Sequence, residues 1–146
     1  MYRVLDVCQY IIEYSNEKGY GISNLKLQKL LYFIQAEFLV ESDEKCFPEK
    51  IIAWDFGPVV LEAYREYKIY GSCQIFNPSV NNSICNLFTE DDRKIIEKIV
   101  DALADYSSTD LLYIIHHQSP WKDYYIPRTN NEIPASVLKE YFSSND

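Results

Sequence analysis

The segment NLKLQKLLYFIQAEFLVES, residues 24–42, restricts the possible folds more than any other part of the chain. Ser23 stands directly before it and suits a helix N-cap, because its hydroxyl can accept a hydrogen bond from the first turn. Apolar side chains recur at helical spacing and form one stripe of Leu27, Leu30, Leu31, Ile34 and Phe38. Outside this stripe lie further apolar residues, among them Leu25, Tyr32, Phe33 and Leu39. The predicted helix is apolar most of the way round, so we expect it at the centre of the fold.

A first amphipathic helix is predicted before this segment. Apolar residues at helical spacing begin at Val4, and the pattern ends at Lys18. Gly19 follows and suits the left-handed conformation that caps many helices.

The stretch AWDFGPVVLEAYREYKIYG, residues 53–71, combines a tryptophan and a Gly-Pro pair with a tyrosine-rich segment. Ile51 to Trp54 is predicted to be a short strand or an extended link. Pro58 suits the first turn of a helix, where the missing N–H removes no hydrogen bond. One face of this helix carries Val60, Ala63, Tyr64 and Tyr67, and the other carries Glu62, Arg65 and Glu66. We expect Gly71 to end it.

Capping patterns predict two helices in the second half of the chain. Thr89 with Asp92 resembles a capping box and opens a helix that runs to Leu103. Ser107 with Asp110 forms a second pattern of this kind, which predicts a helix over the segment TDLLYIIHHQ.

Prolines mark the other boundaries. Pro120 either ends the preceding helix or starts another at Trp121, and Pro134 opens a last helix, ASVLKEYF. Residues 72–88, SCQIFNPSVNNSICNLF, are predicted to be a loop with a short strand at Gln74 to Phe76. Together these patterns predict a mainly α fold, a single domain over residues 1–146. We expect a bundle of five to seven helices around the central one, with at most short β pieces.

Composition excludes several classes of protein. The formal charge is −8, with 22 acidic and 14 basic residues, and this balance disfavours nucleic acid and anionic membranes as partners. The longest apolar run, LLYFI, is far shorter than the ~20 residues of a membrane helix. Asp6, Gln9 and Glu13 interrupt the apolar residues of the first segment, unlike a signal peptide. We therefore expect a cytoplasmic protein.

Metal and catalytic motifs are missing from the sequence. The four cysteines form no CxxC pair and are interpreted as reduced thiols. His116 and His117 would point about 100° apart on a helix, which does not suit chelation of one ion. They are interpreted as imidazoles near a helix C-terminus, and the alternative for His117 is a partner contact or a buried hydrogen bond. We expect no metal, no cofactor and no enzymatic activity.

Polar residues on the central helix leave two sets of alternatives. Lys29 lies between apolar positions, so its ammonium either reaches water along its stem or meets a carboxylate inside the fold. Gln28, Tyr32 and Gln35 form a stripe beside it. These three side chains could line a recognition groove or form hydrogen bonds with neighbouring loops.

Three blocks in a fixed order resemble the Panacea domain, found in SocA-like antitoxins and in phage or mobile-element proteins. They are NLKLQKLLYFIQAEFL, IIAWDFGPVVLEAYREYKIYG and LLYIIHHQSPW, within residues 22–121. The chain departs from the family pattern at His116, where the family often has threonine.

The resemblance implies an antitoxin that neutralises a toxin by direct protein contact, and a proteolytic-adaptor role in which a protease is a second partner. The alternative is a phage or mobile-element encoded regulatory or DNA-associated protein without antitoxin activity. The following residues are predicted either to contact a partner or to belong to the family motif in a structural role: Gln28, Lys29, Tyr32, Trp54, Gly57, Pro58, Tyr64, Arg65, His117 and Trp121.

Overall fold

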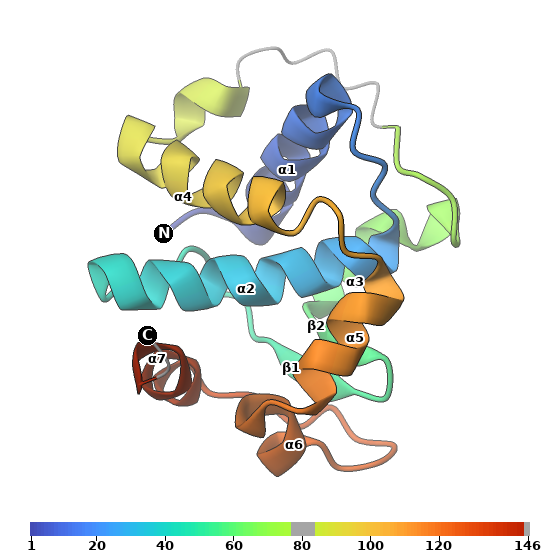
Figure 1. Ribbon diagram of the computed structural model, residues 1–146, viewed down its shortest axis with the longest axis vertical. Coiled ribbons are helices and arrows are strands. Elements are labelled where there is room, and N and C mark those ends of the chain that lie inside the picture. Colours follow the sequence, from blue (N-terminus) through green and yellow to red (C-terminus); the bar gives the residue numbers. More distant parts are fainter. Residues whose placement is uncertain (77–83, 145–146) are drawn as a thin grey trace.

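Helix α2 (Asn24–Ser42) runs through the middle of the molecule, with other helices on both sides (Figure 1). The computed structural model describes residues 1–76 and 84–144. Around α2 this part of the chain places α1 (Val4–Lys18), α3 (Leu61–Tyr67), α4 (Glu90–Ala102), α5 (Ser108–His116), α6 (Ser119–Tyr124) and α7 (Ala135–Ser144). Short 3₁₀ turns lie at Lys68–Tyr70 and Ile84–Leu87. The predicted mainly α fold is confirmed, and the described part contains seven α-helices, within the expected range.

The central position predicted for α2 is confirmed. The helix packs against α1, α3, α4, α5 and α7, and Leu27, Leu30 and Leu31 are fully buried. Ser23 caps it as predicted, because its Oγ accepts a hydrogen bond from the Lys26 N–H at 3.3 Å. Burial of the apolar stripe drives the other helices onto this one.

The predicted helix ends follow local sequence chemistry. Gly19 ends α1 with a φ of 77°, the left-handed conformation that glycine adopts without strain. Ser107 and Asp110 form the complete capping box of α5, whereas Thr89 accepts a single bond from the Asp92 N–H at 3.2 Å. Pro120 lies in the first turn of α6, so this proline starts a helix.

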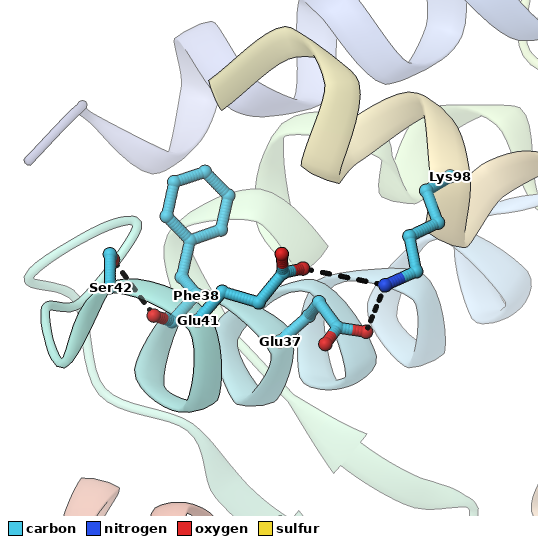
Figure 2. A network of polar contacts seen from close by, with 5 residues as sticks. All are labelled: Glu37, Phe38, Glu41, Ser42 and Lys98. Atoms are coloured by element: carbon cyan, nitrogen blue, oxygen red, sulfur yellow. Dashed lines mark hydrogen bonds and ion pairs between the residues drawn. The ribbon is translucent and has the colours of Figure 1, made fainter. Parts of the chain in front are cut away.

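Polar contacts join α4 to its two neighbours. On the α2 side, the Lys98 Nζ lies 3.5 Å from carboxylate oxygens of Glu37 and Glu41 (Figure 2). On the α1 side, the Tyr14 hydroxyl donates to Asp101 at 2.7 Å, and the Tyr10 hydroxyl donates to the Glu97 carboxylate, one turn earlier in α4. Burial and the neighbouring carboxylate raise the pKa of Tyr10, so its hydroxyl stays a neutral donor. The Lys98 side chain is largely exposed, so its two ion pairs add little to stability.

The Gly-Pro pair belongs to a strand, so the prediction that Pro58 opens a helix is wrong. Strand β1 (Ile52–Trp54) pairs antiparallel with β2 (Gly57–Val59), and Ala53 stands opposite Pro58. The Ala53 N–H points away from β2 and donates to the Asn131 carbonyl at 2.9 Å. The pair is therefore a non-hydrogen-bonded one, in which the missing N–H of proline removes no ladder bond. Helix α3 begins three residues later, at Leu61.

The strand predicted at Gln74 to Phe76 is also absent from the described residues, where this segment is irregular. Its Ile75 N–H donates to the Ile22 carbonyl at 2.9 Å, an isolated backbone bond without a ladder. The predicted loop includes residues 77–83, which lie outside the described part of the chain. Within 1–76 and 84–144, no helix combines the length and apolar character needed to cross a lipid bilayer.

Candidate partner-binding site

Aromatic rings gather around the tip of the β1–β2 hairpin. Trp54 from β1 lies edge-to-face against Tyr64 of α3 and against Phe56 in the hairpin turn, with ring centroids 5.2 and 5.3 Å away. Each of the three rings is partly exposed. The hairpin turn and the start of α3 therefore present one aromatic surface to solvent.

Helices α5 and α6 extend this surface. The Trp121 ring stacks on Tyr125 with centroids 4.5 Å apart and lies against His116 at 4.0 Å. Its indole N–H donates to the Trp54 carbonyl at 2.8 Å, and His116 Nε2 lies 3.0 Å from the Asp55 carbonyl. These bonds fix the end of α5 and the start of α6 to the hairpin. We call the six partly exposed rings the hairpin aromatic cluster: Trp54, Phe56, Tyr64, His116, Trp121 and Tyr125.

A hollow of about 260 Å³ opens at the edge of the cluster. It is lined by residues 54–56 of the hairpin, by Tyr125, and by the turn at residues 128–130. The Trp54 indole N–H donates to the side-chain oxygen of Asn130 at 2.8 Å, and the Tyr125 hydroxyl donates to the Asp55 carboxylate. The bond to this carboxylate raises the pKa of Tyr125. Polar side chains therefore hold the aromatic walls of the hollow in place.

The polar stripe of α2 points inward and forms hydrogen bonds with loops, which was one of the two predicted alternatives. Gln28 accepts a bond from the Val60 N–H at 3.0 Å, and Tyr32 donates to the Gln118 side chain at 2.8 Å. Gln35 accepts from the Cys46 N–H at 2.8 Å. Because each amide or hydroxyl has a partner, burial of these polar groups is compensated.

Lys29 is buried, so both predictions for its ammonium are wrong. The residue is 1% exposed and cannot reach water, and no carboxylate pairs with it in the described part of the chain. Its Nζ donates to the Leu25 carbonyl at 3.3 Å. Burial lowers the pKa of Lys29 to about 8. Gly57, with a φ of 108°, covers the amine, and a Cβ there would lie 3.4 Å from the Lys29 Cε.

The remaining predicted site residues divide by exposure. Pro58 is buried beside Gly57, whereas Arg65 is exposed on α3 next to Tyr64 of the cluster. His117 is also exposed, with its Nδ1 2.7 Å from the Tyr113 carbonyl, so the alternative of a buried hydrogen bond for it is wrong.

Sequence reasoning missed Phe56, Asp55 and the ring of Tyr125. Tyr125 stands four residues after Trp121, a spacing that places two side chains on one side of a helix, and this was the available signal. Phe56 and Asp55 carried no such signal, because the hairpin turn that exposes them was not predicted.

Comparison with known proteins identifies the family. Residues 27–122 match the family model described as "Antitoxin SocA-like, Panacea domain". The chain belongs to this family. The Panacea match runs from α2 to α6 and includes the hairpin and five of the six cluster rings. The predicted resemblance is thereby confirmed.

A curated relative agrees with the Panacea assignment. The chain is 31% identical to "Antitoxin SocA" of Caulobacter vibrioides (strain NA1000 / CB15N) over an alignment of 109 positions, which covers 68% of this chain. The aligned part spans 58% of the length of that relative. No solved structure matches the chain.

Proposed function

We propose that this protein is a cytoplasmic antitoxin that binds a cognate protein toxin directly and neutralises it without turnover. The observation that carries the proposal is the match to the SocA-like antitoxin model over residues 27–122. The half-exposed aromatic cluster on the same segment supports direct contact, because Trp, Tyr and Arg supply many binding anchors.

The motif residues divide into two roles under this proposal. Gln28, Lys29, Tyr32, Gly57 and Pro58 are buried and would hold the hairpin on α2 without touching a toxin. The toxin would contact the more exposed members, which are Trp54, Tyr64, Arg65, His117 and Trp121. The buried set therefore affects binding only through the position of the hairpin.

Growth and co-purification test the proposal. The gene next to this one is expressed from an inducible promoter with and without the antitoxin. We expect growth arrest without it, protection that follows the molar ratio, and a complex that survives gel filtration. A harmless neighbour, or protection without contact, would contradict direct neutralisation.

A matched pair of arginine variants tests the surface. Arg65 and Arg3 are both exposed, but Arg3 lies at the start of α1, outside the hairpin region. We expect Arg65→Ala to weaken protection while its melting temperature stays unchanged, and Arg3→Ala to protect like the natural protein. Equal protection by both variants would exclude Arg65 from the interface.

The proteolytic-adaptor role is a distinct outcome of the same experiment. An adaptor acts catalytically on toxin abundance, so sub-stoichiometric amounts of this protein would lower toxin levels in cells. The DNA-associated alternative predicts a gel shift whose affinity falls steeply with salt. Neither outcome is expected if binding alone neutralises the toxin.

A further inference from the structure

The hollow beside the hairpin has the size of one side chain. Pockets for small molecules usually measure about 300–1,000 Å³, whereas this one measures about 260 Å³ and is partly open. Its place at the edge of the hairpin aromatic cluster suits an anchor residue of a partner protein, inserted while the surrounding rings exclude water.

The walls of the hollow favour a cation. Trp54, Phe56 and Tyr125 contribute aromatic rings, whose faces carry negative potential and attract Arg and Lys. The Asp55 carboxylate lies at the same place and accepts a bond from the Tyr125 hydroxyl. Among the described residues no cation lies within ion-pair distance of Asp55, so its charge is left for a partner.

Among the residues that the structure describes, Arg128 is the one basic residue that lines the hollow, and its charge opposes a cationic occupant. Its backbone has a φ of 63°, and its side chain is exposed on the turn. The guanidinium forms no ion pair with Asp55, although the structure describes both residues. Arg128 therefore lowers the affinity for a cation without neutralising the carboxylate that would bind it.

We propose that this hollow binds an arginine side chain of the partner protein, with the guanidinium stacked on the aromatic walls and paired with Asp55. Arginine fits better than lysine because its planar group can stack on a ring and form two parallel bonds with one carboxylate. The net charge of −8 would steer a basic partner surface toward the protein. The identification of this partner as the toxin rests on the proposed function. The binding of an arginine side chain in the hollow is argued independently of that function.

Titration with capped tripeptides tests the chemistry directly. The probes are Ac-Gly-Arg-Gly-NH₂, Ac-Gly-Lys-Gly-NH₂ and Ac-Gly-Glu-Gly-NH₂, added to the isotopically labelled protein. The chain has two tryptophans, both in the cluster, so two indole N–H signals report on the site by NMR. We expect the arginine peptide to shift the Trp54 signal saturably, with a Kd on the order of 10 mM or tighter. The lysine peptide should bind more weakly, and the glutamate peptide should cause no saturable shift.

Two charge variants give opposite predictions. Asp55→Asn keeps an acceptor for Tyr125 but removes the charge, and we expect about tenfold weaker binding of the arginine peptide. Arg128→Gln removes the like charge and should strengthen binding. The near-UV circular dichroism of each variant checks that the aromatic packing is intact. Preferential binding of the glutamate peptide, weaker arginine binding in Arg128→Gln, or no saturable shift with any probe would overturn the proposal.

Protection assays separate this inference from the proposed function. If the arginine peptide binds but the neighbouring gene product is harmless, the arginine site is supported and the antitoxin function is refuted. If the protein protects cells but the peptides do not bind, the antitoxin function is supported and the arginine site is refuted. If both proposals are supported, Asp55→Asn should reduce protection and Arg128→Gln should not.

Discussion

At the scale of single residues, burial of Lys29 carries an electrostatic penalty. Its ammonium is almost fully buried and has a backbone carbonyl as its hydrogen-bond partner. A buried charge without a counter-ion destabilises a fold unless the group loses its proton, and burial accordingly lowers the pKa of Lys29 to about 8. The folded chain therefore binds fewer protons than the unfolded chain between about pH 8 and the ordinary lysine pKa of about 10.4.

This difference in bound protons predicts a pH-dependent stability. The contribution of Lys29 to the free energy of unfolding should rise as the pH increases from about 8 to about 10.4. Lys29→Met should be more stable than the natural protein at pH 7. The difference between their free energies of unfolding should become smaller as the pH rises from about 8 to about 10.4. Urea denaturation at several pH values measures it, and the difference between the two proteins removes the effect of tyrosines that titrate nearby. Lys68→Met, at an exposed lysine, is the control and should leave the pH dependence unchanged.

At the scale of elements, α2 is the helix against which the others pack. Leu31 is fully buried on it, whereas Leu25 on the same helix is 37% exposed. Leu31→Ala should lower the free energy of unfolding by about 2–5 kcal/mol, through lost apolar burial and the cavity that remains. Leu25→Ala is the matched control and should change it by about 0.5 kcal/mol or less. Urea denaturation followed by far-UV circular dichroism measures both, and a cost below about 1 kcal/mol for Leu31→Ala would contradict the central role of α2.

At the scale of the whole molecule, the fold should depend on apolar packing and not on a bound metal. In the described part of the chain, no group of three His, Cys, Asp or Glu side chains is placed to hold a metal ion. We expect the purified protein to melt at the same temperature with and without a chelator, because no metal binding is coupled to folding. Elemental analysis that finds one zinc or iron per chain would refute this expectation.

Helices and their ends could be predicted because their determinants are local. Ser23, Gly19 and the Ser107 capping box act within one helical turn, and the apolar stripe of α2 is visible from spacing alone. The hairpin could not be predicted in this way. Pro58 is compatible with a helix start, and it lies in a strand because Ala53 directs its own N–H to Asn131, a residue far along the chain.

The candidate site shows the same division between local and long-range information. Ordered sequence blocks were sufficient to indicate the Panacea family, since they depend only on the residues themselves. Only the tertiary structure decided that Lys29 is buried under Gly57 and that Gln28 and Tyr32 form hydrogen bonds with loops. It also decided that the Trp121 indole donates a hydrogen bond to the Trp54 carbonyl. These contacts join residues about 30 to 90 positions apart. Their energies depend on which surfaces the packed helices bring together, and no local pattern in the chain encodes that arrangement.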